Sequence, residues 1–189
     1  GGTIAFTLAK AGKDVTVIAR GSHLKAIQEN GLGIHRLWDD SVERVRIKAC
    51  TAEEYSGEAD VIFICVKGYS IPDIIPFIEK NAGKDTAIVP ILNIYTTGET
   101  LRAALPDKYI TDGCIYVSAN IESPGTLLMH SKILRVIYGL APGMEDRAVL
   151  HDLEKELNEA GIRGIYSSSI RRDAMKKFSY VSPIGAAGL

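Results

Sequence analysis

The stretch that decides the fold is Gly1-Gly2-Thr3-Ile4-Ala5-Phe6-Thr7-Leu8-Ala9-Lys10-Ala11-Gly12, which runs into Asp14-Val15-Thr16-Val17-Ile18-Ala19-Arg20. The first segment opens with small residues and ends at Gly12, which predicts a helix whose start permits close approach of backbone or phosphate. The second segment is a short β-branched run, typical of a buried parallel strand. Together they predict the first helix and the second strand of a nucleotide-binding βαβ unit.

Arg20 follows the predicted strand directly, and two glycines open the predicted helix. Ligands of open α/β sheets bind at the carboxyl ends of strands, so Arg20 is placed to meet the ribose end of a dinucleotide. Gly1 matches the third glycine of a G-x-G-x-x-G turn, but helix packing explains Gly1 and Gly2 equally well. No strand and no earlier glycines precede Gly1, so we expect the chain to lack the true beginning of this unit.

Composition and length indicate a soluble globular protein with one full domain and part of a second. The chain has 189 residues, of which 46% are hydrophobic and 24% charged, with a net charge of -1. We therefore expect neither nucleic acid nor a membrane as a partner, and no apolar run approaches the roughly 20 residues that span a bilayer. The four histidines lack metal-ligand spacing, so no metal site is expected. Cys65 and Cys114 lie in apolar runs, which predicts buried thiols and a cytoplasmic location.

Two further buried strands are each followed by a polar residue. The run 60–66 precedes Lys67, and the run 86–92 precedes Asn93. Their alternation with helical segments predicts an α/β fold, with a Rossmann-like parallel sheet and helices on both faces. Right-handed crossovers would place Arg20, Lys67 and Asn93 along one edge of that sheet. Strands also end in polar residues simply where they reach water, but three such residues with a glycine-opened helix favour a site.

The remaining elements follow from periodicity and turn residues. Helices are expected over 22–30, 70–81, 98–105, 143–160 and 170–189, with Pro76 delaying or kinking the second of these. Strands are expected over 33–35, 42–49, 109–120, 133–140 and 163–166, with a turn at 123–125. We place a domain boundary near residues 167–169.

Lys177 interrupts an apolar helical stripe near the end of the chain. It shares a face with Ala174, Val181, Ile184 and Gly185. A lysine in such a stripe snorkels to water, pairs with another group, or serves in a cleft, and a buried lysine has a lowered pKa that suits proton exchange. Lys176 would point about 100° away, toward solvent.

In six short sequence blocks, several of them quoted above, the chain resembles the ketopantoate reductase (2-dehydropantoate 2-reductase) family. The resembling blocks, in order along the chain, are Gly1-Gly2 through Ala11-Gly12, Val17-Ile18-Ala19-Arg20-Gly21, Val66-Lys67-Gly68-Tyr69, Ile91-Leu92-Asn93, Tyr116-Val117-Ser118-Ala119 and Lys177-Phe178. The resemblance implies NADPH-dependent reduction of ketopantoate to pantoate, in the pathway to pantothenate and coenzyme A. It implies an NADP-binding Rossmann-like domain over 1–167, without its first strand, and the start of a helical substrate domain over 168–189.

The resemblance also implies roles for individual residues. Gly1 and Gly2 would adjoin the cofactor, Arg20 would bind its 2′-phosphate, and Ala119 would contact it through the backbone. Lys67 and Asn93 would lie at the nicotinamide-ribose end, with Asn93 also near the substrate. Lys177 would be catalytic, hydrogen-bonding the keto oxygen and donating a proton to it.

Some positions depart from the family pattern. Ile94 stands where the family commonly has glycine, and Val181 and Gly185 replace two substrate-binding asparagines. Ser182 is the nearest polar substitute for substrate binding, although it lies on a different helical face. A reductase of another small 2-keto acid and a non-catalytic NADPH-binding sensor therefore stay open as alternatives, as does a homodimer. We further expect the 189 residues alone to bind NADPH poorly and to need a helical C-terminal continuation for activity.

Overall fold

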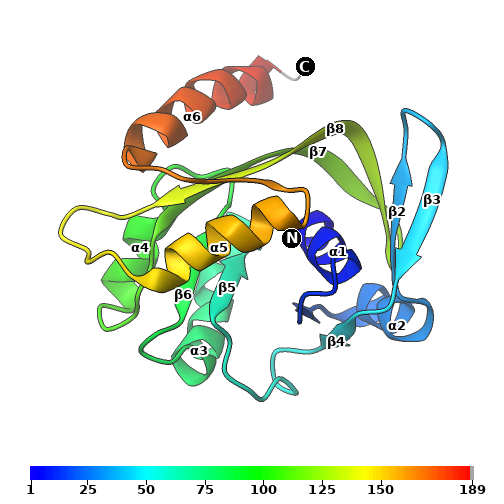
Figure 1. Cartoon of the computed structure of the whole chain (residues 1–189), viewed down its shortest axis with the longest axis horizontal. Coiled ribbons are helices and arrows are strands. Elements are labelled where there is room, and N and C mark those ends of the chain that lie inside the picture. Colours follow the sequence, from blue (N-terminus) through cyan, green and yellow to red (C-terminus); the bar gives the residue numbers. More distant parts are fainter. Residues whose placement is uncertain (188–189) are drawn as a thin grey trace. The chain divides into compact units, whose positions relative to one another are not determined.

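The fold was obtained as a computed structural model, which describes residues 1–187 and the side chains of residues 1–179. Helices and strands are both distributed along the whole described chain (Figure 1). In order they are α1 (Gly2–Lys10), β1 (Thr16–Ile18), α2 (Gly21–Asn30), β2 (Leu32–Arg36), β3 (Ser41–Val45), β4 (Lys48–Cys50), β5 (Val61–Ile64), the 3₁₀ turn η1 (Gly68–Ser70), α3 (Ile71–Asn81), β6 (Ala87–Pro90), α4 (Thr97–Ala104), β7 (Asp112–Ser123), β8 (Thr126–Gly139), α5 (Ala148–Glu159), β9 (Arg163–Tyr166) and α6 (Ile170–Ala187).

The chain forms two compact units, each with its own apolar core. Unit 1 comprises Gly1–Ser56, Tyr116–Arg135 and Glu156–Arg163. Unit 2 comprises Gly57–Ile115, Val136–Lys155 and the described part of Gly164–Leu189.

Unit 1 contains the predicted helix–strand pair at the start of the chain. Helix α1 contacts β1, β2 and β3. Gly12 follows the Ala11 C-cap with a φ of 80°, a left-handed conformation that glycine adopts without strain and that lets the chain turn toward β1. Strand β1 pairs in parallel with β4, so that Val17 lies opposite Ala49. The core of this unit is Phe6, Ile27, Leu32, Ile34, Leu127 and Met129.

Unit 2 contains the second parallel pair. Strands β5 and β6 run in parallel, with Val61 opposite Ala87 and Ile64 opposite Pro90. Helix α3 begins at Ile71 after Ser70, the expected cap, and contains Pro76 in its interior, so the late start expected from Pro76 is not observed. Helix α4 contacts both α3 and β6. The core of this unit is Ile64, Ile71, Ile78, Ala82, Ile88, Leu92, Leu101, Leu105 and Ile110.

A mixed sheet accompanies the parallel pairs. Its strand order is β3-β2-β8-β7, with β9 paired to β8. Strand β2 is antiparallel to β3 and parallel to β8. Strands β7 and β8 are joined by the predicted turn, in which Gly125 has a φ of 75°. The predicted α/β class with parallel pairing is thus confirmed, and the mixed sheet is an addition to it.

Two burial predictions are wrong in detail. The run 60–66 was expected to be buried throughout, but Val61, Ile62 and Phe63 are half-buried. Among the described residues β5 pairs only with β6, so its other edge has no strand cover. Cys65 is exposed because it follows the last strand residue, whereas Cys114 is buried as predicted.

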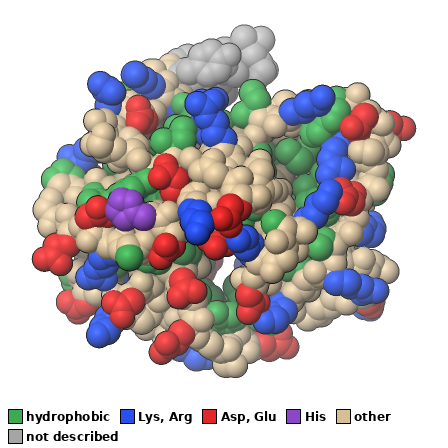
Figure 2. Space-filling model, viewed as in Figure 1, with side chains coloured by type: hydrophobic (Ala, Val, Ile, Leu, Met, Phe, Trp, Pro, Cys, Tyr) green, Lys and Arg blue, Asp and Glu red, His purple; other side chains and the backbone are tan. Residues whose placement is uncertain are grey.

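The described surface and interior show two further general features. Acidic and basic side chains are interspersed over the face drawn in Figure 2. Within residues 1–187, no helix has the length and apolar character to cross a bilayer, and no three His, Cys, Asp or Glu residues gather as metal ligands would.

Candidate functional site

Lys177 and Asn93 form the central contact of the candidate site in unit 2. The Lys177 side chain is 4% exposed, and its Nζ donates a hydrogen bond of 2.7 Å to Oδ1 of Asn93. The Nζ atom also lies 4.9 Å from the centroid of the Phe178 ring. The ammonium therefore does not snorkel to water: it is buried and paired, while Lys176 is exposed as predicted.

The amphipathic pattern of α6 explains why Lys177 is buried. Ile170, Ala174 and Phe178 recur at intervals of four residues and are all buried. Lys177 lies on the same side of the helix, next to Phe178, whereas Met175 is 52% exposed on the other side. The start of the helix is fixed by Asp173, whose carboxylate accepts a 2.6 Å hydrogen bond from the Ser167 hydroxyl.

Tyr95 connects the segment after β6 to α6. Its ring packs edge-on against Phe178, with centroids 6.0 Å apart. Its hydroxyl donates to the carbonyl oxygen of Arg171 at 3.5 Å. These contacts hold the Asn93 loop against the helix that carries Lys177.

Burial sets the electrostatics of this site. Desolvation lowers the pKa of the Lys177 ammonium, and the nearby Cys114 thiol opposes this in part. Burial likewise raises the pKa of the Cys114 thiol, against the effect of Lys177. The Lys177 ammonium is consequently a stronger acid than that of an exposed lysine, as expected of a proton donor.

Lys67 follows β5 just as Asn93 follows β6. Because Ile64 lies opposite Pro90, both residues stand three positions beyond paired strand residues, at the carboxyl ends of the two strands. The two loops touch, since a Cβ on Gly68 would overlap the side chain of Ile94. Both Lys67 and Asn93 are exposed.

A small cavity of about 190 Å³ adjoins the start of α4. Its polar lining includes Arg102, Asp112 and Arg171, and Ala174 of α6 also lines it. Arg102 pairs with Asp112 at 2.9 Å, and Arg171 approaches the same carboxylate at 4.0 Å. The sequence alone did not predict this cavity, nor that Cys114 lies near Lys177, because in each case the residues come from distant parts of the chain.

The other predicted cofactor residues lie in unit 1. Gly1 is the exposed N-cap of α1, and no side chain caps the helix there. A Cβ on Gly2 would lie 2.6 Å from Cδ1 of Leu127, which supports the helix-packing explanation for that glycine. Ala119 is exposed on β7.

Arg20 is the exposed N-cap residue of α2, with extended backbone at φ -146° and ψ 163°. Within the described part of the chain its guanidinium makes no ion pair or side-chain hydrogen bond. Ser182 lies outside the residues whose side chains the structure describes, as do Val181 and Gly185. The cofactor and substrate roles assigned to all of these residues stay predictions.

Comparison with known proteins gives a consistent result. A family model described as "Ketopantoate reductase PanE/ApbA" matches residues 1–143. "Uncharacterized oxidoreductase YkpB" of Bacillus subtilis is 26% identical over 182 residues, covering 96% of this chain and 59% of that protein. A 2-dehydropantoate 2-reductase of Pyrococcus horikoshii is 27% identical, covering 98% of this chain and 60% of that protein.

Solved structures agree with these matches. The crystal structure of 2-dehydropantoate 2-reductase from Porphyromonas gingivalis W83 has a TM-score of 0.86 at 30% identity, covering 98% of this chain and 67% of that one. A D-mandelate dehydrogenase solved with NADH and anilino(oxo)acetate shares the fold, with a TM-score of 0.80 at 21% identity, covering 93% of this chain and 56% of that one. The chain thus spans a little under two thirds of the curated relatives it matches.

Proposed function

Because this chain belongs to the ketopantoate reductase family of oxidoreductases, we propose that it carries out the NADPH-dependent reduction of 2-dehydropantoate to pantoate. That reaction would place it in the pathway to pantothenate and coenzyme A. The observation that carries the proposal is the buried Lys177 ammonium, held by Asn93 at 2.7 Å and made more acidic by burial.

The residues of unit 1 fit a phosphorylated dinucleotide. The uncapped start of α1 presents backbone N–H groups, and such helix starts attract phosphate. Arg20 offers an exposed guanidinium after β1, and a planar fork of donors suits a 2′-phosphate. No acidic residue stands there to accept from a ribose hydroxyl, which favours NADPH over NADH.

Lys177 is the proposed proton donor in unit 2. When bound, NADPH supplies the hydride that reduces the keto carbon. Lys177 gives its proton to the keto oxygen as that oxygen gains electrons, and a hydroxyl group results. Asn93 accepts one N–H of the ammonium, which fixes the direction of the others. The aromatic ring of Phe178 lies beside the same ammonium and keeps it away from water.

Further statements about the whole protein are part of the same proposal. We place a nucleotide-binding domain over residues 1–167 and the start of a helical substrate domain over 168–189. Lys67 would meet the nicotinamide ribose and Ser182 the substrate. A cytoplasmic location also stays a prediction.

A second substrate is retained for one reason. Val181 and Gly185 stand where the resemblance implies substrate asparagines, so another small 2-keto acid is the alternative substrate.

The test is NADPH oxidation by the full-length protein with 2-dehydropantoate and with a panel of small 2-keto acids. The proposal expects the highest kcat/KM with 2-dehydropantoate. A higher kcat/KM with another acid would transfer the function to that substrate. NADPH binding without turnover of any acid would refute catalysis and indicate a sensor.

A further inference from the structure

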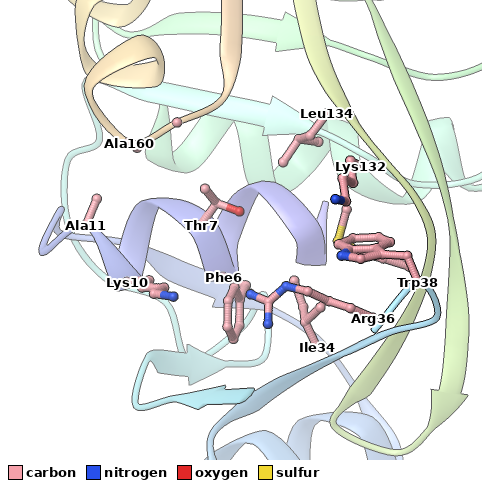
Figure 3. A pocket seen from close by; sticks show the side chains of 12 residues that line it. Phe6, Thr7, Lys10, Ala11, Ile34, Arg36, Trp38, Lys132, Leu134 and Ala160 are labelled. Carbon is pink, nitrogen blue, oxygen red and sulfur yellow. The ribbon is translucent and has the colours of Figure 1, made fainter. Parts of the chain in front are cut away.

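A second and larger cavity lies in unit 1, along the last turns of α1. Its volume is about 420 Å³, within the range of small-molecule sites. Its floor is apolar, because the buried side chains of Phe6, Ile34 and Met129 line it together with Leu134. Figure 3 shows these walls, with Lys10 and Ala11 at one end and Trp38 and Lys132 at the other.

Three basic side chains converge on this apolar floor. Lys10, Arg36 and Lys132 all line the cavity, and none of the lining residues is acidic. Lys132 Nζ lies 6.0 Å from the centroid of the Trp38 ring, so a cation and an aromatic face stand at the same end. In Figure 3 the Arg36 guanidinium lies beside Phe6, between the two ends.

Glu43 offsets part of this charge from outside the cavity. Its carboxylate binds Lys10 at 2.7 Å and Arg36 at 2.8 Å. These pairs fix both basic groups in position. The lining stays net positive, since its three cations face the carboxylate of Glu43 and, more weakly, that of Asp39, which interacts with Arg36. Arg36 is partly buried, with 23% of its side chain exposed, so an anion beside it would be shielded from water.

We propose that this cavity binds a small amphipathic carboxylic acid, that is, a short alkyl chain or single ring that carries one carboxylate. The apolar part lies over Phe6 and Ile34 and against the Trp38 ring. The carboxylate meets Arg36 and Lys132. Buried apolar area provides the affinity, and the basic groups select an anion over a neutral molecule.

This site is separate from the cofactor contacts proposed above. The lining residues of α1 are Phe6, Thr7 and Lys10, followed by the C-cap Ala11, whereas the uncapped helix start is at Gly1 and Gly2. At about 1.5 Å per helical residue, the lining residues lie between roughly 6 Å (Phe6) and roughly 12 Å (Lys10) along the axis from Gly2. The inference therefore does not depend on the reductase activity.

Trp38 provides a built-in reporter, because it is the single tryptophan of the chain. The experiment titrates the protein with octanoate while Trp38 emission is recorded, and repeats the titration with 1-octanol, which has the same chain without a charge. Equilibrium dialysis of labelled octanoate covers the case in which bound ligand leaves the emission unchanged. The proposal expects one saturable octanoate site and much weaker binding of 1-octanol.

Variants test the named residues. Lys132→Ala and Arg36→Ala should each weaken octanoate binding about fivefold, as expected for a partly exposed ion pair. Ala160→Leu should fill the cavity and abolish binding, because Ala160 lines it. Lys25→Ala is the matched control, since Lys25 is exposed on α2, does not line the cavity, and should leave the affinity unchanged. Thermal unfolding checks that each variant folds. If Arg36→Ala does not fold, Lys132→Ala still tests the proposal, because Lys132 is exposed and its replacement should leave the fold intact.

Two results would overturn the proposal. One is the absence of saturable octanoate binding by both emission and dialysis. The other is equal uptake of octanoate and 1-octanol that neither Lys132→Ala nor Ala160→Leu changes, which would indicate non-specific apolar adsorption.

Discussion

Replacement of Lys177 by methionine should remove most of the reductase rate while leaving the protein folded. Methionine has nearly the length of lysine, so it fills the same space beside Ala174 and Phe178, which are both buried. The lost partner is Oδ1 of Asn93, and because Asn93 is exposed, water can replace the lysine donor.

The expected loss of rate follows from the proposed role. A positioned general acid contributes about 10²–10⁴-fold, which corresponds to about 2.7–5.5 kcal/mol of transition-state free energy. Stability should change in the opposite direction. The pKa of Lys177 is lowered, so the fold disfavours its charged form relative to water, and removal of that charge should maintain or raise the melting temperature at neutral pH.

The assay is steady-state NADPH oxidation by the full-length protein, combined with NADPH binding and thermal unfolding. Lys176→Met is the matched control, because Lys176 is exposed on the neighbouring face, and it should be nearly silent. A Lys177→Met enzyme within threefold of the parent kcat/KM would refute the proton-donor role. Equal losses of kcat/KM in Lys177→Met and Lys176→Met would show that the assignment of the functional role to Lys177 and not to Lys176 is wrong.

Three further outcomes follow from the same geometry. As pH rises through the lowered pKa of Lys177, kcat/KM should fall at a pH below the ordinary lysine value of 10.5. Between the folded-state pKa and 10.5 the melting temperature should rise with pH, because the unfolded state binds more protons there. A fall of kcat/KM that begins only at or above pH 10.5 would contradict the burial argument. Arg20→Ala should weaken NADPH binding about ten- to hundredfold, a loss of about 1.5–3 kcal/mol, while NADH binding measured in the same titration changes little; equal losses would exclude a 2′-phosphate contact. Gly98→Ala should lower the free energy of unfolding by about 1–3 kcal/mol, because the added Cβ would lie 2.8 Å from the Thr111 carbonyl oxygen and would overlap the Asp112 carboxylate. Chemical denaturation measures this, with Glu99→Ala as the control that should not show the loss. An unchanged denaturation midpoint for Gly98→Ala would show that the cavity wall moves to accommodate the methyl group.

Local patterns predicted the elements well where turn residues bound them. The last strand was expected over 163–166 and is observed as Arg163–Tyr166, two residues after Gly161, which has a φ of 88°. The β5–β6 pair also followed from local signals, because apolar runs alternate with helical periods. The single edge strand expected over 42–49 is instead two strands, β3 and β4, and β4 pairs in parallel with β1. Lys176 and Lys177 were separated correctly, since a step of about 100° distinguishes a buried from an exposed helical face.

Long-range pairing is what the sequence did not contain. Strand β2 pairs with β8 across some 90 intervening positions, with Gly33 opposite Thr126, and no local pattern encodes that register. Asn93 and Lys177 were each predicted as site residues, but their hydrogen bond joins positions 84 apart. Cys65 appeared buried because its run is apolar, yet the strand ends one residue earlier at Ile64.

Hydride transfer is the central claim, and isotopic labelling tests it most directly. The full-length protein is supplied with 2-dehydropantoate and with NADPH that carries deuterium on one face or the other of the nicotinamide ring, and the product is analysed by mass spectrometry. The account predicts pantoate with one deuterium on the carbinol carbon from one of the two labelled cofactors, and its near absence in Lys177→Met. Unlabelled product from both cofactors, or no reduced product at all, would contradict it.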